Sequence, residues 1–225
     1  MSGVAAAVLF DMDGLLVDSE PLWTVAEEEL AAEFGGVWSE QIKAAIVGTR
    51  LDVSVPAILE WYAVPPTPDR VEWAASFLLR RMVELFESEL PLAPGAVTLL
   101  DALGARRVPV GLVSSSYRVL VEAALGQLGR ERFAVTLAGD EVGHGKPHPE
   151  PYLTACAALG VDPAGCVVLE DAPSGIAAAE AAGCIAVAVP SVAAIVATPR
   201  RPVVESLADI DPDWLLSLPD HPAAV

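Results

Sequence analysis

Positive charge is scarce in this chain. Lysine and arginine together number 13, against 31 aspartates and glutamates in 225 residues, and the formal net charge is -18. A surface this acidic repels phosphate backbones, so we expect no nucleic-acid partner. It also repels small phosphates at long range, and any phosphate-binding site must therefore supply its own local positive charge.

The sequence also has few cysteines and no long apolar run. Cys156, Cys166 and Cys184 show neither CxxC spacing nor a metal-ligand pattern, which favours small buried residues in a reducing compartment. No apolar run reaches the roughly 20 residues that would span a bilayer. The first apolar stretch has no basic segment before it, as a signal peptide would. We expect a cytoplasmic protein with no membrane partner.

What the sequence does contain is an alternation of apolar strands and amphipathic helices. Residues 5–10 form an uncharged apolar run, which is typical of a strand buried on both faces. After residue 90, strand-like apolar segments alternate with helix-like amphipathic segments. We expect helices over 96–103, 117–128, 150–159 and 174–182, and strands over 108–113, 133–138, 166–169, 184–189 and 203–204. This order predicts an α/β fold, a Rossmann-like parallel sheet with helices on both faces.

A helical stretch separates the first strand from the others. Leu22, Ala26, Leu30 and Phe34 recur at helical spacing and predict an amphipathic helix over 21–34. Further helical patterns cover 39–47, 51–62 and 68–90. We therefore expect a helical domain, residues 18–90, inserted into an α/β core made of residues 1–17 and 91–225.

Polar residues directly follow the predicted strands. In open parallel sheets, ligands bind outside the carboxyl ends of the strands, so these side chains are expected to converge. In chain order they are Asp11, Asp13, Ser114, Ser115, Lys146, Glu170 and Asp171. Each one alone is weak evidence, since Asp-Gly is also a common turn pair and serines often cap helices.

Together, these groups form a set suited to phosphate chemistry. Crowded carboxylates repel one another, and a hard divalent cation such as Mg²⁺ relieves the repulsion. The ammonium of Lys146 and the hydroxyl of Ser114 could bind phosphate oxygens. A carboxylate beside a bound phosphate can attack phosphorus, and a second carboxylic acid could protonate the leaving oxygen and later deprotonate water.

Four segments resemble the motifs of the haloacid dehalogenase superfamily and occur in the family's order. They are Phe10-Asp11-Met12-Asp13-Gly14-Leu15-Leu16-Val17-Asp18-Ser19-Glu20, Leu112-Val113-Ser114-Ser115-Ser116, Gly145-Lys146-Pro147 and Leu169-Glu170-Asp171. The helical insert falls where family members with a small α-helical cap domain carry theirs. The resemblance is strongest to the subgroup of sugar-phosphate phosphatases and β-phosphoglucomutases.

The resemblance implies a role for each matching position. Asp11 matches the nucleophile and a metal ligand. Asp13 matches the general acid/base, and its backbone carbonyl matches a magnesium ligand. Asp171 matches a metal carboxylate, with Glu170 alongside as a ligand or close neighbour. Lys146, Ser114 and Ser115 match the phosphate-binding groups. A magnesium-dependent phosphatase acting on a small phosphorylated substrate is therefore implied.

Residues of the insert are expected to set the substrate. Trp23 lies close to the first motif, and Val47-Gly48-Thr49-Arg50 resembles the cap loop that carries a specificity residue. Arg50 could clamp a second phosphate or a sugar hydroxyl, and Arg80 could add a positive contact. The mutases have a histidine where this chain has Trp23, and the difference favours a sugar-phosphate phosphatase.

Some alternatives stay open at this point. β-Phosphoglucomutase is the alternative among enzymes, and a non-catalytic phosphate-binding or regulatory protein is the alternative from another class. We expect a monomer or a weak homo-oligomer. His144 and His148 flank Lys146 as a conceivable metal pair, although hard magnesium sites prefer oxygen and loop polarity is the simpler interpretation.

Overall fold

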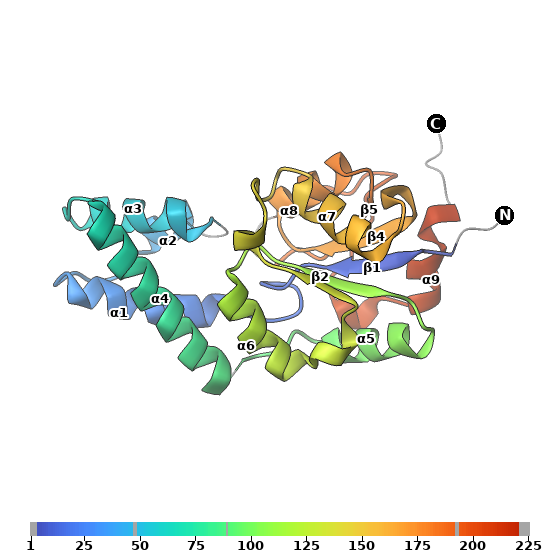
Figure 1. The fold of residues 1–225 in the computed structure, drawn as a ribbon, viewed down its shortest axis with the longest axis horizontal. Helices are drawn as coiled ribbons and strands as arrows, with labels where there is room; N and C mark the ends of the chain where they lie inside the picture. The colour runs from blue at the N-terminus through green and yellow to red at the C-terminus, as the bar shows by residue number, and fades with distance from the viewer. Residues whose placement is uncertain (1–3, 47–48, 89, 192–193, 221–225) are drawn as a thin grey trace.

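A five-stranded parallel sheet lies at the centre of the core (Figure 1), in a computed structural model that describes residues 4–46, 49–88, 90–191 and 194–220. The strand order is β3-β2-β1-β4-β5. The strands are β1 Ala7–Phe10, β2 Val110–Val113, β3 Val135–Leu137, β4 Cys166–Glu170 and β5 Ile185–Ala188. The central strand β1 pairs with both β2 and β4, so that Leu9 faces Gly111 on one side and Val168 on the other.

Helices cover both faces of the sheet because alternate side chains of each strand point to opposite sides. Val8 and Phe10 pack with one layer, and Ala7 and Leu9 pack with the other. The first layer is α5 Ala96–Ala105, α6 Arg118–Leu128 and α9 Pro212–Ser217, and the second is α7 Glu150–Leu159 and α8 Pro173–Ala181 (Figure 1). This confirms the predicted α/β fold.

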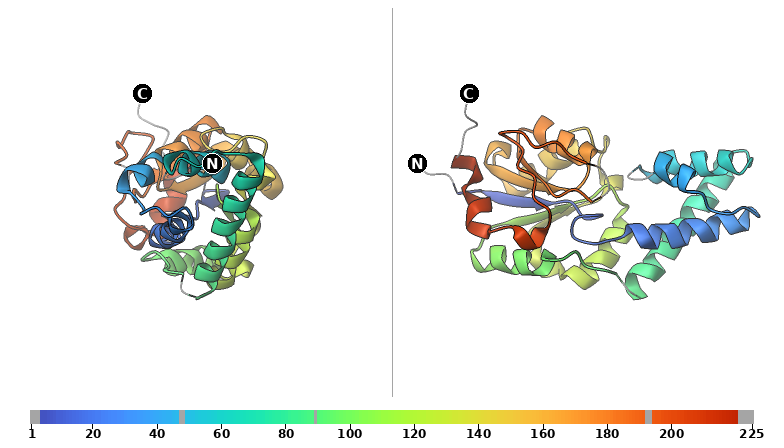
Figure 2. Two further views of the ribbon diagram at one scale, coloured as in Figure 1. Left: turned by 90° about the vertical axis from the view of Figure 1, so that its left-hand side faces the viewer. Right: turned by 180° about the vertical axis from the view of Figure 1, so that it is seen from behind.

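The insert is helical, as predicted, and projects from one end of the sheet (Figure 2). It consists of α1 Glu20–Glu33, α2 Glu40–Ile46, α3 Leu51–Trp61 and α4 Pro68–Ser88. The buried residues of α4 recur every fourth position, at Ala74, Leu78, Met82 and Phe86, and form one apolar stripe. Within the insert, α4 packs against α1. The same helix also packs against the core helix α6 and so joins the insert to the core.

Short 3-10 helices complete the core. They are η1 Arg130–Arg132, η2 Gly139–Glu141, η3 Pro163–Gly165, η4 Leu207–Asp209 and η5 Leu218–Asp220.

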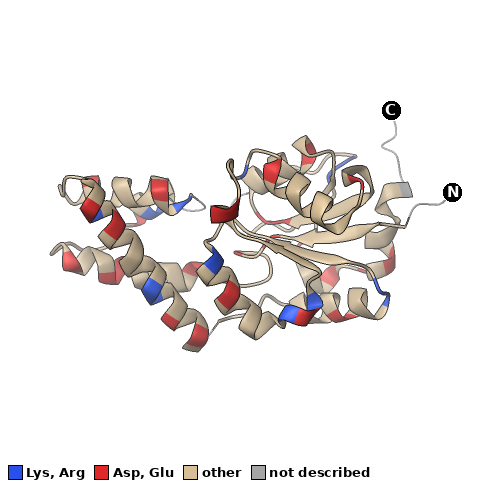
Figure 3. Cartoon of the chain, in the orientation of Figure 1, with Lys and Arg blue, Asp and Glu red and all other residues tan. Residues whose placement is uncertain are grey.

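Acidic residues are spread over core and insert, with basic residues thinly scattered among them (Figure 3). In the part of the chain that the structure describes, no helix combines the length and the apolar character that crossing a membrane requires.

The expected strand at 203–204 was wrong. Val203 makes only an isolated parallel bridge to Ala188, through hydrogen bonds that flank it on either side. The amide of Ala188 donates to Pro202 O at 2.9 Å, and the amide of Val204 donates to Ala188 O at 2.9 Å. Pro202 has no amide hydrogen with which to extend a ladder, so the pairing stops there.

Cys156, Cys166 and Cys184 are free and buried, as expected.

Candidate active site

Carboxylates, hydroxyls and an ammonium meet at the carboxyl edge of the sheet. Asp11 follows β1 directly and is 6 % exposed, while Ser114 follows β2 and is 3 % exposed. Glu170 is the last residue of β4, and Asp171 comes next. Parallel strands bring these positions together because all their carboxyl ends share one edge. The sequence-based expectation of convergence is therefore confirmed in its geometry.

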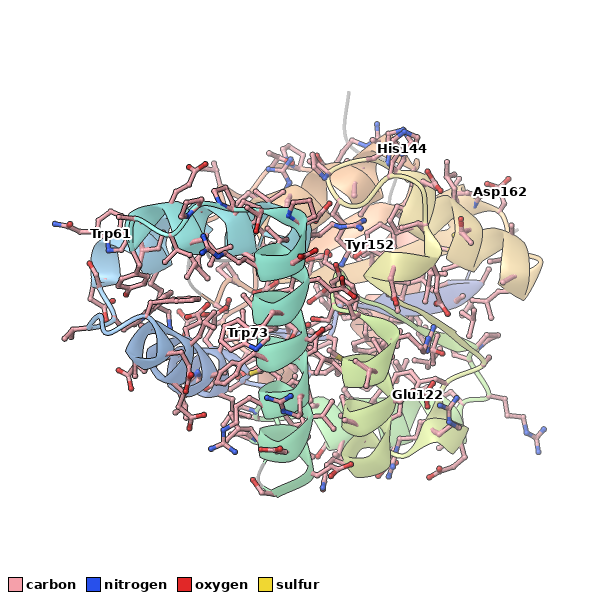
Figure 4. All side chains as sticks on the ribbon, turned by 60° about the vertical axis from the view of Figure 1, so that its left-hand side comes forward. Trp61, Trp73, Glu122, His144, Tyr152 and Asp162 are labelled. Carbon is pink, nitrogen blue, oxygen red and sulfur yellow. The ribbon has the colours of Figure 1, made fainter. Side chains whose placement is uncertain are left out.

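Lys146 is the centre of this cluster. Its side chain is 4 % exposed, and Nζ donates to Asp11 Oδ1 at 2.5 Å, to Glu170 Oε1 at 2.6 Å and to Val113 O at 2.9 Å. The hydroxyl of Tyr152 donates to the same Glu170 oxygen. Tyr152 belongs to α7 and lies inside the core (Figure 4). All three protons of the ammonium thus have acceptors, which fixes its position next to Asp11.

Burial and excess negative charge shape the titration of these groups. Burial raises the pKa of Asp11 well above its usual range, and the charges of Glu170, Asp171 and Asp13 add to the rise although Lys146 opposes it. Burial also raises the pKa of Asp171 to about 7, against the hydrogen bond from Ser191. For Lys146, burial alone would lower the pKa, but Asp11 and Glu170 outweigh burial and raise it. One ammonium therefore does not neutralise the carboxyl groups around it.

The donor set fits a hard divalent cation. One oxygen from each of Asp11, Glu170 and Asp171 lies within 4.8 Å of the others. Oxygen ligands with excess negative charge are what Mg²⁺ prefers, and a cation would relieve the repulsion among these carboxylates. Each of these carboxylates accepts hydrogen bonds through one oxygen: Asp11 from Lys146, Glu170 from Lys146 and Tyr152, and Asp171 from Ser191. All three are therefore candidate ligands through the other oxygen.

Asp13 is held by serine hydroxyls. Its Oδ1 accepts from Ser19 Oγ at 2.7 Å, and its Oδ2 accepts from Ser116 Oγ at 2.8 Å and from Ser114 Oγ at 3.2 Å. These contacts hold the carboxyl group in a fixed position, which an acid/base group needs. Ser114, expected as a phosphate-binding group, donates its hydroxyl hydrogen bond to Asp13. Ser115 lines the cavity next to Asp11.

Two glycines let the backbone approach the carboxylates closely. Gly14 has a φ of +79°, and a Cβ added there would lie 2.2 Å from Asp171 Oδ2. A Cβ on Gly175, in α8, would lie 1.9 Å from the carboxylate of Glu170. Both approaches exclude any side chain, which explains glycine at these positions.

Two cavities adjoin the cluster. The first, of about 420 Å³, is lined by Asp11, Lys146, Glu170 and Asp171 among others. The second, of about 100 Å³, lies between insert and core and is lined by residues including Trp23 and Arg50. Four residues line both cavities: Asp13, Glu20, Thr49 and Ser115. The insert therefore borders the space next to Asp11, which is where a cap domain would meet a substrate.

The expected insert residues divide into two groups. Trp23 and Arg50 line the second cavity, and Arg50 Nη1 reaches the core to donate to Gly139 O at 3.1 Å. Arg80 is exposed on α4, lies with its guanidinium 5.7 Å from the Phe77 ring centre, and is not among the residues lining either cavity. Val47 and Gly48, part of the expected cap loop, lie outside the described residues.

His144 and His148 are not among the residues that line either cavity. Both are exposed, with ring centres 4.6 Å apart, and His144 Nδ1 lies 2.8 Å from Glu150 Oε2. The carboxylate of Glu150 also accepts from the amides of Gly143 and His144, so it organises the loop that carries Lys146.

Sequence reasoning missed several groups of the site. Ser19 and Ser116 hold Asp13, Tyr152 holds Glu170, and Ser191 donates to Asp171 Oδ2 at 2.5 Å. Ser19 and Ser116 stand inside the recognised motifs, so their position was a usable signal. Nothing in the sequence around Tyr152 or Ser191 marked those residues.

Comparison with known proteins identifies the class of enzyme. A family model described as haloacid dehalogenase-like hydrolase matches residues 5–183. The chain therefore belongs to this family of hydrolases.

Named relatives add detail. Hexitol phosphatase B of Escherichia coli K12 is 36 % identical over 189 residues, covering 82 % of this chain and 83 % of its own. Fructose-1-phosphate phosphatase of the same organism is 34 % identical over 183 residues, which cover 81 % of this chain and 95 % of the phosphatase. The crystal structure of a β-phosphoglucomutase from Clostridium difficile superposes with a TM-score of 0.82 at 23 % sequence identity. The superposition covers 96 % of this chain and 97 % of the mutase, so the two proteins share the fold.

Proposed function

We propose that this protein is a magnesium-dependent phosphatase that hydrolyses a small phosphomonoester, a sugar phosphate, through a phosphorylated Asp11. The observation that carries the proposal is the contact of Lys146 Nζ with Asp11 Oδ1 at 2.5 Å beside a 420 Å³ cavity. This contact places a fixed cation next to the carboxylate that would attack phosphorus, in a chain otherwise strongly acidic. Phosphoryl transfer depends mainly on such positioning and charge neutralisation.

In the first step, an Asp11 oxygen forms a bond to phosphorus while the bond from phosphorus to the substrate oxygen breaks. Asp13, in its protonated form, gives its proton to the departing oxygen and releases the alcohol. Asp13 lines both cavities and so borders the space that the leaving group would occupy. Lys146 keeps Asp11 in place and offsets the charge gathered there.

In the second step, a water molecule attacks phosphorus and gives its proton to Asp13. The bond between phosphorus and Asp11 breaks, which releases inorganic phosphate and restores the carboxylate. The serine hydroxyls at 2.7–3.2 Å from Asp13 hold its side chain in position for this proton transfer. Ser115, which lines the catalytic cavity, is proposed to donate to a phosphate oxygen.

Mg²⁺ is proposed to be held by Asp11 and Asp171, with the Asp13 carbonyl and Glu170 as further candidates. It would supply charge neutralisation for the phosphoryl oxygens. We also propose that residues 18–90 act as the cap domain over a core of residues 1–17 and 91–225. The free, buried cysteines suit a reducing compartment, and we propose the cytoplasm.

A mutase would need to hold a second phosphate in the cap. The lining of the second cavity contains Arg50, whose guanidinium already lies 3.2 Å from Asp52 and donates to Gly139 O. These contacts do not exclude a phosphate on Arg50, and the proposal of hydrolysis over mutase chemistry is supported instead by the phosphatases among the relatives named above.

The test is phosphorus NMR on the purified protein with Mg²⁺ and a panel of hexose and hexitol phosphates. We expect release of inorganic phosphate, and a drop of at least about 10³-fold in turnover for Asp11→Asn. Interconversion of glucose 1-phosphate and glucose 6-phosphate without phosphate release would support the mutase instead. No reaction on any substrate, with a folded protein, would contradict the enzyme assignment.

A further inference from the structure

Glu27 is a buried carboxyl group that the proposed chemistry does not use. It lies in α1, is 8 % exposed, and its Oε2 has no hydrogen-bond partner among the described residues. Leaving a buried polar group unpaired destabilises the folded state, and more so when the group is charged. Because native proteins rarely leave such groups unpaired, this oxygen calls for a partner that the described residues do not supply.

Glu27 lines the 100 Å³ cavity between insert and core. A volume of this size holds several water molecules or the end of a small substrate. The same cavity shares Asp13, Glu20 and Ser115 with the catalytic cavity. A substrate with its phosphate beside Asp11 and its carbon chain beyond Asp13 would therefore extend toward Glu27.

The cations in this lining are already engaged. Lys43 Nζ contacts Thr24 Oγ1 and lies 3.6 Å from Glu20 Oε2. Arg50 is bonded to Asp52 and to Gly139 O. A second phosphate would face Glu20 and Glu27 without a free cation in the described lining, whereas a neutral hydrogen-bond donor would meet an open acceptor.

Burial raises the pKa of Glu27 to about 7, with Lys43 opposing the rise and Glu20 adding to it. Near neutral pH the carboxyl group therefore exists in both forms, one a pure acceptor and the other also a donor. A hydroxyl group can pair with either form. An ammonium could only donate, and a phosphate dianion could only accept.

We propose that Glu27 is a specificity-determining residue that hydrogen-bonds a hydroxyl group at the end of the substrate remote from the phosphate. The inference rests on the proposed phosphatase function and narrows its substrate class. Glu27 would favour phosphorylated polyols and sugars that carry a free hydroxyl at that end. It would disfavour bisphosphates and phosphate esters with an apolar end.

The test compares two substrates in Glu27→Leu. For sorbitol 6-phosphate we expect kcat/KM to fall about 10- to 150-fold, which is the loss of one hydrogen bond to a charged group. For p-nitrophenyl phosphate, which has no hydroxyl, we expect a change of less than about threefold on the same grounds. Glu27→Gln keeps an acceptor and a donor and should recover part of the loss. Glu28→Leu, on the exposed side of the same helix, is the matched control.

An equal loss on both substrates would overturn the inference, because Glu27 would then act only through the structure of the cap. Unchanged kinetics on both would overturn it too, because no substrate group would contact Glu27. Wild-type protein that releases phosphate from neither compound, nor from any other sugar phosphate, would instead refute the proposed function itself. The two failures are thus told apart by the wild-type measurement.

Discussion

The catalytic edge of the sheet and the cavity under the insert treat buried charge in opposite ways. At the sheet edge, Lys146 has an acceptor for every proton, and Asp13 accepts from three serine hydroxyls. Under the insert, Glu27 Oε2 lines the cavity and is buried without a described hydrogen-bond partner. The first region is organised before a ligand arrives, whereas the second leaves a carboxylate oxygen open.

This difference separates two tasks. Chemistry on phosphorus is the same for any phosphomonoester, so its groups can be fixed in advance, and fixed groups cost no reorganisation during reaction. Recognition of the rest of the substrate depends on groups that lack partners until a ligand supplies them. An open carboxylate oxygen in the insert therefore fits a region that sets the substrate rather than the reaction.

The largest expected effect comes from breaking the organised region at its centre. Lys146→Met leaves Asp11 and Glu170 buried with no ammonium between them. We expect the free energy of unfolding, measured in urea with a metal chelator present, to fall by about 3–5 kcal/mol. Turnover with Mg²⁺ should fall at least about 10²-fold, because the group that positions Asp11 is lost.

The double variant Asp11→Asn/Lys146→Met should recover part of the lost stability, because it removes one of the uncompensated charges. Arg106→Met is the control, since Arg106 pairs with Asp213 on the surface, where such pairs contribute about 0–1 kcal/mol. A Lys146→Met protein as stable as the control would contradict the central role of the ammonium.

The site at the sheet edge was predictable to a large extent because it follows from topology. Asp11, Ser114 and Asp171 each follow an apolar strand, and parallel strands bring such positions together without any knowledge of packing. Tyr152 escaped prediction because it comes from α7, and its contact with Glu170 depends on how that helix rotates onto the sheet. Helix rotation is set by packing, not by strand order.

The insert was predictable as helices but not as a binding surface. The apolar spacing of α1 and α4 marked both helices, yet Glu27 looked like one of several acidic residues in a run. Its burial arises from tertiary packing, because it lines a cavity together with residues of other helices, including Lys43, Leu78 and Leu120. The exposed position of Arg80 has the same origin, since spacing alone does not say which face of α4 meets the cavity.

A smaller effect should reveal the unpaired carboxyl group under the insert. The pKa of Glu27 is raised from 4.5 to about 7, so the folded state keeps this proton when the unfolded chain has lost it. Its contribution to stability is therefore lost as pH rises through this window. We expect the free energy of unfolding of the wild type to fall by up to about 3 kcal/mol more than that of Glu27→Gln between about pH 4.5 and pH 7.

Urea unfolding at a series of pH values, with chelator present, measures this difference. Other buried carboxyl groups contribute to both proteins alike, so the difference isolates Glu27. Glu28→Gln should follow the wild-type curve, because Glu28 is exposed on the same helix. Parallel curves for the wild type and Glu27→Gln would mean that Glu27 has a partner in solution, and the contrast between the two regions would disappear.

The smallest expected effect lies where the two regions touch. Arg50 of the insert donates to Gly139 O of the core at 3.1 Å, and its side chain is 30 % exposed. Arg50→Met should therefore lower the free energy of unfolding by about 1 kcal/mol or less. Because the contact holds the insert beside Ser115, we expect a severalfold rise in KM for sorbitol 6-phosphate with little change in kcat. Arg70→Met, at an exposed arginine of the same insert, is the control. A large drop in kcat instead would show that Arg50 acts on the reacting phosphate, and that the insert takes part in the chemistry as well as in recognition.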